Sequence, residues 1–409
     1  MLSVILQIVL VIVFWNVQQR SDPESYIRIA TDYYNRGEWY PEKKELYSNY
    51  LFAPGLINYF ILQLKVFGTL KLNPIFNIMM NCGILYYIFI LSKKIFSPIA
   101  AYISIIIWCI LYSNIMIVIS AGTEIPFLFI VLSASCLCIF KNKYPYLLLA
   151  GILFILGNWI RPLALIFVIS IIVYFIFNRY SWESYGALIS SMIITIIFIG
   201  SFTKQNTGLF FFQSSTSGVN LIMTANDKSY GGVATNLFKD TTSLCYIKNA
   251  SSLTFIEKDS IWKERAITWI KKHPTKYLFL YVKKIAGLFI EDSWPDRPIL
   301  GGDGVIGNNL SNKMNKGVFF PRCVHMISRS MSYYIILVLF IIGIIKYFRF
   351  YNIKQHIFLI SVLILGIGIT CIFSVSPRYH YPFLFVIVLY TGSMIDKTFF
   401  DKKNDKIII

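Results

Sequence analysis

The chain has 409 residues, of which 56% are hydrophobic and only 14% are charged, whereas about 25% of a soluble domain is charged. Apolar stretches long enough to cross a bilayer recur along it, which excludes a soluble domain and indicates an all-α, polytopic membrane protein. The net charge of +18 is explained by lysines and arginines in cytoplasmic loops and by attraction to anionic lipid head groups or phosphates. We therefore expect contact with the lipid bilayer and no nucleic-acid partner.

The first apolar segment, residues 1–17, has no positively charged start and no small-residue cleavage site after it. This favours a retained membrane span over a removed signal peptide. A second apolar run, residues 51–67, follows a polar and aromatic stretch, and the charge pattern described next leaves both of its ends outside. We therefore expect a long first outer loop, residues 18–73. In it, residues 51–67 lie at the interface or dip into it, broken at Pro54-Gly55.

Basic residues follow alternate apolar runs in the middle of the chain. Lys93 and Lys94, then Lys141, then Arg179 come after every second run, and such residues concentrate in cytoplasmic loops. About ten transmembrane helices with both termini inside result. The predicted spans are residues 1–17, 72–91, 98–120, 125–140, 144–160, 162–177, 185–202, 333–345, 357–373 and 381–395.

A long polar segment divides the chain into three predicted parts. These are an N-terminal transmembrane module (1–202), a mixed extracytoplasmic and interfacial region (203–331), and C-terminal transmembrane helices with a cytoplasmic tail (332–409). The middle region contains an amphipathic helical pattern at 257–272. It also contains an apolar stretch, 277–290, that carries Lys283 and Lys284. Two lysines at the centre of a bilayer are costly, so we expect this stretch at the interface or in the protein interior.

The cysteines and histidines show no metal-binding pattern. Five of the seven cysteines lie in apolar runs, where packing is their ordinary role. Cys245 and Cys323 fall in the outer region, and their pairing stays open. The four histidines are scattered. We expect no metal site and no cofactor.

Polar residues cluster on one predicted face, at the outer ends of the spans. They are Asp22, Glu24, Glu124, Arg161, Lys204, Asn206, Arg378 and Tyr379. Cations stabilise the charge that develops on a phosphate leaving group, and a carboxylate within hydrogen-bond reach removes the proton of an acceptor hydroxyl. This combination favours transfer of a sugar from a lipid phosphate. Asp22 also suits the N-cap of a helix beginning at Pro23, and the two interpretations are compatible.

The order of these motifs resembles the C-type glycosyltransferases that use polyprenyl-phosphate sugars, the superfamily of protein O-mannosyltransferases and aminoarabinose transferases. Residues 22–30 look like the opening D-x-x-x-Y-x-x-x-A of that family, residues 123–126 like its second-loop acid motif and residues 158–162 like its T-R-P. Residues 377–382 are similar to its closing R-Y-x-x-P.

Two motifs depart from the family pattern. Residues 53–55 resemble its P-G-Y-P element, but Leu56 and Ile57 replace the tyrosine and the proline. Residues 204–210 and 218–226 resemble R-N-x-x-x-x-G-x-F and G-x-N-L-x-x-G-N, with Lys204 and Gln205 in place of the arginine pattern. The resemblance covers nearly the whole chain, and its strength lies in six motifs that occur in the correct order on one predicted face.

The resemblance implies a role for each residue. Asp22 is the expected catalytic base and Glu124 its acidic partner. The expected donor-phosphate ligands are Arg161, Lys204 and Arg378, and Lys283, which lies outside these motifs, is a second candidate for the donor phosphate. The expected substrate-binding residues are Glu24, Tyr26, Asn206, Asn220 and Tyr379. The implied enzyme moves a sugar from an undecaprenyl-phosphate-type donor to an envelope glycan, lipid or protein, on the outer face of a bacterial plasma membrane.

Alternatives remain open for the residues and for the function. Arg161 suits an interface anchor that snorkels to head groups, Glu124 suits the first turn of a helix, and Arg378 suits a span end. A polysaccharide polymerase also has about ten spans and a long outer loop, but needs no acid after the first span. A lipid-sugar flippase would place ionisable residues in a midplane cavity, usually with internal symmetry.

Overall fold

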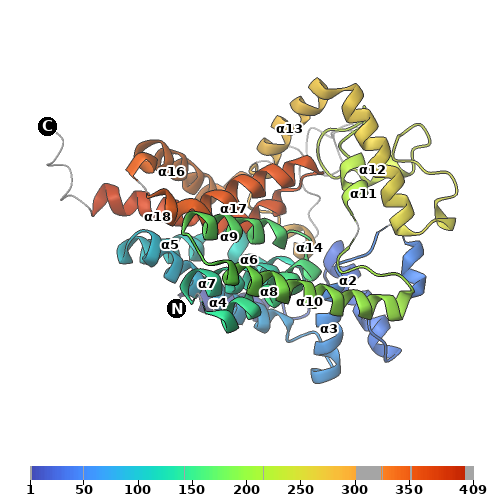
Figure 1. Cartoon of the computed structure of the whole chain (residues 1–409), viewed down its shortest axis with the longest axis horizontal. Helices are drawn as coiled ribbons and strands as arrows, with labels where there is room; N and C mark the ends of the chain where they lie inside the picture. Colours follow the sequence, from blue (N-terminus) through green and yellow to red (C-terminus); the bar gives the residue numbers. More distant parts are fainter. Residues whose placement is uncertain are drawn as a thin grey trace.

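The structure is a computed structural model of the chain, and it describes residues 2–400 except 49, 142, 215, 301–323, 325 and 351. Regular secondary structure in this part consists of α-helices and short 3-10 turns (Figure 1). Strand-like pairing among the described residues is limited to an isolated bridge between Gly232 and Val375. The all-α class predicted from the apolar runs is therefore confirmed.

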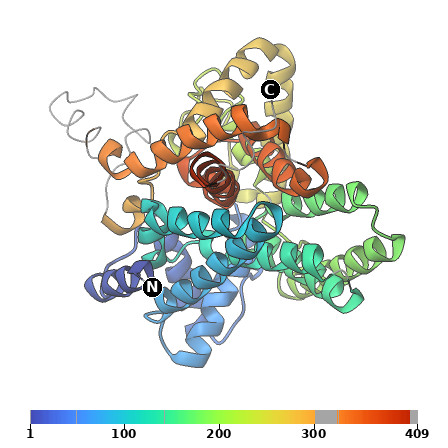
Figure 2. The same cartoon turned by 90° about the vertical axis from the view of Figure 1, so that its left-hand side faces the viewer.

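Four helices are long and apolar enough to cross a membrane by length and composition: α4 (Asn73–Ile95), α10 (Trp182–Thr207), α17 (Ile353–Ile372) and α18 (Tyr381–Phe399) with the 3-10 turn before it. They run along a common direction in Figure 1. Figure 2 looks along the bundle and shows α18 near its centre. Residues 383–389 of α18 are almost completely buried, because neighbouring helices surround it.

The predicted span 98–120 is not one straight helix. It consists of α5 (Pro98–Ile110), α6 (Tyr112–Met116) and a 3-10 turn (Ile117–Ile119), and the two halves differ in direction by 67°. The break falls at Leu111, which has extended backbone angles. The side-chain amide of Asn114 donates to the carbonyl oxygen of Trp108 at 3.0 Å, so a side chain satisfies a carbonyl near the break. Hydropathy alone did not show this bend, because Asn114 is the single strongly polar residue of the run.

Five shorter apolar helices complete the bundle: α1 (Leu2–Val13), α7 (Glu124–Phe140), α8 (Tyr144–Ile160), α9 (Ala164–Phe177) and α16 (Met331–Tyr347). At about 1.5 Å per residue they reach about 18–26 Å, less than the ~30 Å of a hydrocarbon core. Together with the four long helices and the bent pair, these five helices correspond to the ten apolar segments predicted as spans. The count of about ten crossings stays a prediction, since four or five of these segments meet the length criterion.

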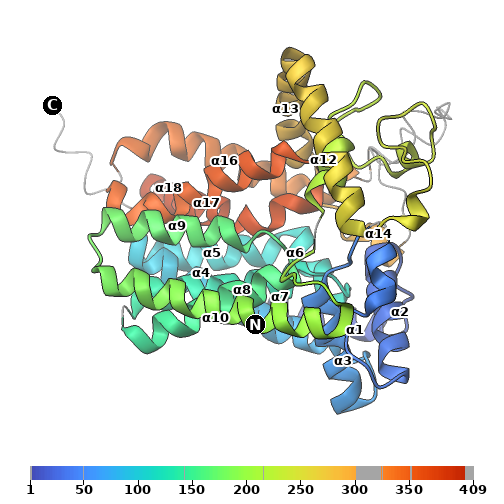
Figure 3. The ribbon, with the colours of Figure 1, turned by 45° about the vertical axis from the view of Figure 1, so that its right-hand side comes forward.

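The basic connections between the helices gather at one end of the bundle. Figure 3 shows the α7–α8, α9–α10 and α16–α17 connections at the same end. Hydrogen bonds tie this end together: Lys94 donates to the carbonyl oxygen of Ile139 at 2.8 Å, and Asn178 donates to that of Lys354 at 3.0 Å. The alternation of charge along the sequence thus corresponds to one physical end of the molecule, which is the end we predict to be cytoplasmic.

The first loop carries α2 (Asp22–Asn35), a 3-10 turn (Lys43–Tyr47) and α3 (Pro54–Phe67) at the opposite end (Figure 3). Pro54 begins α3 rather than breaking it, because proline at the first helical position loses no helical hydrogen bond. A Cβ on Gly55 would lie 2.7 Å from the backbone nitrogen of Ile160. Glycine therefore lets α3 pack directly on the end of α8.

The polar middle region folds around its own small core at the same end. It contains α11 (Ser217–Ile222) and α12 (Phe255–Lys272), followed by α13 (Pro274–Leu288) and α14 (Asp296–Leu300). The predicted amphipathic helix is confirmed, and it starts at a capping box formed by Thr254 and Glu257. Trp262 and Trp269 of α12 face the core.

Candidate active site

The first acid of the loop between α1 and α3 forms an ion pair with an arginine from the other end of the chain. Ser21 holds the N-cap position of α2 with φ of 61°, and Asp22 is the first helical residue. The Asp22 carboxylate accepts a hydrogen bond from the Arg378 guanidinium. The carboxylate is therefore not occupied with helix capping, and it faces the residue predicted to hold the donor phosphate.

Arg378 lies in a 3-10 turn, η6 (Pro377–His380), between α17 and α18. The extended residues before the turn are held by the polar middle region. Ser374 donates through its backbone to the carbonyl oxygen of Asn220 at 3.1 Å and through its hydroxyl to the Asn220 side-chain oxygen at 3.0 Å. Val375 donates to the carbonyl oxygen of Gly231 at 3.2 Å. The structure thus places Asn220, predicted as a substrate ligand, in contact with the segment that carries Arg378.

A second ion pair lies deeper. Glu124 begins α7, Arg161 follows the last residue of α8, and a guanidinium nitrogen of Arg161 lies 3.1 Å from a carboxylate oxygen of Glu124. Their side chains are 6% and 9% exposed, against 30% and 32% for Asp22 and Arg378. A buried arginine paired in this way is not a snorkelling anchor. The outer pair meets solvent and the inner pair is enclosed.

The ring of Tyr379 lies between the two pairs. Its centroid is 5.3 Å from the guanidinium carbon of Arg161 and 5.5 Å from that of Arg378, within the range of cation–π attraction. The ring of Tyr379 therefore lies close to both guanidinium groups. We call Asp22, Tyr26, Glu124, Arg161, Arg378 and Tyr379 the ion-pair cluster.

Tyr26, one turn after Asp22 on α2, completes the cluster. Burial raises the pKa of its phenol well above the usual range, Asp22 and Glu124 raise it further, and Arg378 and Arg161 lower it. The four charged groups therefore all affect the pKa of the Tyr26 hydroxyl, which stays protonated at neutral pH. Burial and the nearby Asp22 also raise the pKa of Tyr50. Tyr50 was not predicted, because an aromatic residue in an outer loop is ordinary.

The remaining predicted ligands are placed differently. Glu24, Lys204 and Lys283 are exposed, and within the described residues no hydrogen bond or ion pair joins them to the cluster. Lys283 lies over the ring of Phe279 at 4.6 Å. Its neighbour Lys284 is buried instead and donates to the carbonyl oxygen of Ile372 at 3.1 Å. Asn206 lies half-buried in the last turn of α10. Their binding roles stay predictions.

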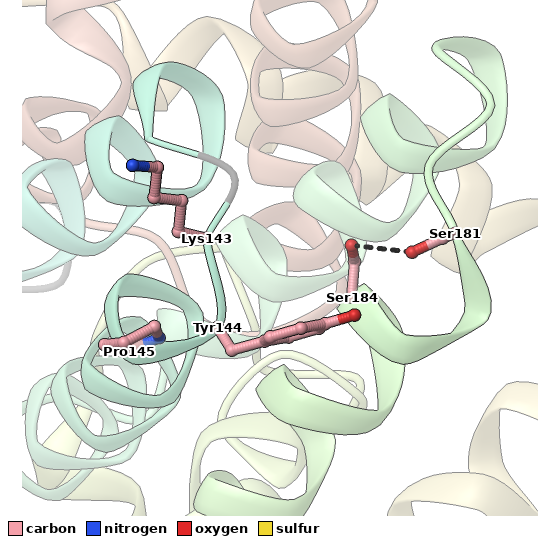
Figure 4. A pocket seen from close by; sticks show the side chains of 5 residues that line it. All are labelled: Lys143, Tyr144, Pro145, Ser181 and Ser184. Carbon is pink, nitrogen blue, oxygen red and sulfur yellow. Dashed lines mark hydrogen bonds between the residues drawn. The ribbon is translucent and has the colours of Figure 1, made fainter.

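A cavity of about 410 Å³ lies at the opposite end of the bundle, between the starts of α8 and α10 (Figure 4). It is lined by Lys143, Tyr144, Pro145, Ser181 and Ser184, and the Ser181 and Ser184 hydroxyls lie 3.4 Å apart. No member of the ion-pair cluster borders it. The chemistry suggested by the charges is therefore located at the end that carries α2 and α3, and not in this cavity.

Both acids of the cluster are engaged by guanidinium groups, and the described residues contain no group of three His, Cys, Asp or Glu side chains placed to hold a metal ion. Cys245 is buried, and its potential partner Cys323 lies outside the described residues. The cluster contains two carboxylates and two guanidiniums, so its formal charges balance. An incoming phosphate would compete with a carboxylate for an arginine.

Comparison with known proteins gives the following matches. No family model and no curated protein matches the chain. The oligosaccharyltransferase AglB from Archaeoglobus fulgidus, in complex with an inhibitory peptide and a dolichol-phosphate, matches with a TM-score of 0.47 and 14% identity, over 97% of this chain and 50% of its own. ArnT from Cupriavidus metallidurans, bound to undecaprenyl phosphate, matches with a TM-score of 0.39 and 9% identity, over 96% of this chain and 77% of its own. The chain spans about half the length of that oligosaccharyltransferase.

Proposed function

We propose that the protein is a membrane glycosyltransferase that moves a sugar from a polyprenyl-phosphate donor to an envelope glycan, lipid or protein on the outer face of a bacterial plasma membrane. The observation that carries this proposal is the Asp22–Arg378 pair, which lies beside the buried Glu124–Arg161 pair at one end of an apolar helical bundle. A base and two cations at a membrane surface suit a reaction whose leaving group is a lipid phosphate.

In the proposed reaction, the donor phosphate binds to the Arg378 guanidinium and displaces the Asp22 carboxylate from it. One guanidinium group can donate two parallel hydrogen bonds to two oxygens of the same phosphate, and such charge-assisted hydrogen bonds are strong. The displaced carboxylate is then available to an acceptor. Asp22 suits this exchange better than Glu124, because it is the more exposed of the two acids.

The transfer step replaces one carbon–oxygen bond at the anomeric carbon by another and moves one proton. The oxygen of the acceptor hydroxyl attacks the anomeric carbon of the sugar while the bond from that carbon to the phosphate oxygen breaks. The acceptor proton passes to Asp22, and the polyprenyl phosphate leaves with the bonding electron pair. Arg378 stabilises the negative charge that develops on the phosphate. Arg161 lies beside the ring of Tyr379, and the ion pair with Glu124 fixes the orientation of the Arg161 guanidinium.

Purified protein in liposomes containing undecaprenyl-phosphate sugars, each labelled in the sugar, tests the proposal. We expect transfer of label to glycan, lipid or protein fractions of bacterial envelope. Asp22→Asn removes the base and should reduce the rate by roughly a hundred- to ten-thousand-fold. The matched control is Asp32→Asn on the same helix, where the carboxylate is 55% exposed and pairs at the surface with Arg36.

Three outcomes would contradict the proposal. Near-wild-type transfer by correctly inserted Asp22→Asn would remove Asp22 from the chemistry. Polymerisation of lipid-linked repeat units that does not depend on Asp22 would indicate a polymerase. Movement of a lipid-linked sugar across the liposome membrane without transfer would indicate a flippase. Mass spectrometry of envelope glycans with and without the gene identifies the acceptor.

A further inference from the structure

His380 is a fully buried histidine that ends the turn carrying Arg378 and Tyr379. Its ring lies between two aromatic rings. The Phe289 centroid is 6.0 Å away at an interplanar angle of 26°, and the Tyr333 centroid is 5.0 Å away at 19°. The stacking fixes the plane of the imidazole, so the directions of its two nitrogens are determined.

Both nitrogens of His380 face oxygen acceptors. Nδ1 lies 2.9 Å from the carbonyl oxygen of Leu288, and Nε2 lies 3.4 Å from Oδ1 of Asp292. A carbonyl oxygen only accepts, so Nδ1 carries a hydrogen. An ionised carboxylate also only accepts, so Nε2 needs a hydrogen as well. The doubly protonated imidazolium is the form of the ring that serves both acceptors.

Asp292 is also fully buried and needs a positive partner. Its Oδ2 accepts a hydrogen bond from the backbone of Ser113 at 3.0 Å, whereas neither Oδ1 nor the facing Nε2 of His380 has a hydrogen-bond partner among the described residues. A buried carboxylate without a counter-charge is strongly unfavourable. The neighbouring acids Glu291 and Asp296 pair with Arg297 and Arg329. Within the described residues, the basic side chain at ion-pair distance from Asp292 is thus His380.

The position of the pair connects it to the ion-pair cluster. The segment with Arg378 and Tyr379 is held at its start by Asn220 and Gly231, and at its end by His380. We propose that Asp292 and His380 form a buried imidazolium–carboxylate pair that positions Arg378 and Tyr379 for the donor phosphate. This role rests on the proposed function, whereas the protonation of the pair does not.

Nitrogen NMR of protein labelled with ¹⁵N at histidine tests the pair directly. The chain has four histidines, and substitution of His273, His325 and His356 leaves His380 as the single signal. We expect both ring nitrogens to carry protons at neutral pH in this protein. Asp292→Asn should convert the ring to a form with one proton. A neutral His380 ring in the parent protein, or an imidazolium signal unchanged by Asp292→Asn, would overturn the pair.

Groups around the ring set the conditions of this measurement. Among the described residues, the phenols that interact with Asp292 are those of Tyr112, Tyr333, Tyr334 and Tyr381, and Tyr381 also interacts with Glu124. A phenol in its ordinary form does not titrate between pH 6 and pH 8. The NMR measurement at neutral pH therefore does not depend on the ionisation of these phenols.

Kinetics with undecaprenyl-phosphate sugars tests the positioning role. Asp292→Asn should raise the donor KM by about ten- to hundred-fold and change the acceptor KM much less. Asp292→Glu, which keeps the charge, should recover part of the loss. The matched control is His356→Gln, because His356 is a buried histidine at the other end of the bundle, with Nδ1 3.2 Å from the Tyr390 hydroxyl. It should leave both constants unchanged.

The two measurements separate the two proposals. An imidazolium signal without any transfer of a polyprenyl-phosphate sugar would support the pair and refute the proposed function. Transfer activity with a donor KM that Asp292→Asn does not change, in protein that inserts normally, would refute the positioning role alone. Equal rises of donor and acceptor KM would indicate general loss of structure and also refute it.

Discussion

Asp22 and Arg378 form an ion pair across 356 positions of sequence. It joins the loop before α3 to the last connection of the helical bundle, so this end of the molecule contains residues from both ends of the chain. Their side chains are about one-third exposed, so a ligand can reach the pair. The exchange of Asp22 for phosphate on Arg378 is therefore the central step that mutations can test.

Replacement of Arg378 by alanine should weaken donor binding more than it slows the acceptor step. Charge-assisted hydrogen bonds to a phosphate contribute about 1.5–3 kcal/mol, which corresponds to roughly a ten- to hundred-fold rise in donor KM. Arg378→Lys should recover only part of this loss, because an ammonium group cannot bind two oxygens in a planar fork. Initial rates at varied donor concentration measure the effect. An unchanged donor KM in Arg378→Ala would contradict a phosphate role.

Breaking the buried Glu124–Arg161 pair should cost stability. Removal of one partner leaves a buried charge uncompensated, at a cost of about 3–5 kcal/mol. Either Glu124→Gln or Arg161→Gln should therefore lower the thermal unfolding midpoint in detergent. The double variant should be less destabilised than the sum of the two single variants, because neither charge then remains unpaired. Additive losses would show that the pair is not a coupled unit.

A methyl group at Gly55 should disturb the site without touching a charge. The added Cβ would lie 2.7 Å from backbone atoms of Trp159 and Ile160, so α3 must move away from α8. Overpacking of this kind costs about 1–3 kcal/mol, and the neighbouring Arg161 should shift with the end of α8. Gly55→Ala should lower both stability and transfer rate. The matched control Gly186→Ala, where nothing lies within 4 Å of the added atom, should leave both nearly unchanged.

The buried Lys284 should make stability depend on pH in the alkaline range. Burial lowers the pKa of its ammonium group from 10.5 to about 8. Between these two values the unfolded chain binds more protons at this position than the folded chain, so the contribution of Lys284 to the free energy of unfolding rises with pH. Urea unfolding at pH 7.5 and 9.5 should show this rise in the wild type. Lys284→Met should lack it.

The exposed neighbour Lys283 provides the control for this measurement. Lys283→Met should keep the wild-type dependence on pH, because the charge removed lies in solvent. The same rise with pH in Lys284→Met and in the wild type would assign it to another group.

Much of the fold followed from run lengths and charge. Apolar stretches bounded by Lys93 or Arg179 became helices whose ends gather at one side of the bundle, because charged side chains avoid the apolar interior. The bend at Leu111 did not follow. It depends on Asn114 and Asp292, which supply hydrogen bonds at the break from different parts of the chain.

The sequence by itself determined the all-α class, the polar end of the molecule and four residues that the structure brings together: Asp22, Glu124, Arg161 and Arg378. Because a charged residue is costly in an apolar chain, each of these four residues could be identified as a candidate from the sequence. Only the tertiary structure decided their partners. Asp22 pairs with Arg378 rather than with Glu124, because an acid lowers its energy beside a cation and not beside another acid.

The tertiary structure also determines which of two adjacent residues of the same type is buried. Lys283 and Lys284 are identical side chains, yet α13 turns one to solvent and buries the other against the end of α17. In the sequence, His380 is one residue of a short motif and has no predicted role. In the structure, Asp292, 88 positions earlier, faces it in the core. Helix rotation and long-range contacts set such differences, because they depend on the positions of neighbouring elements in space, which are not encoded in any local pattern.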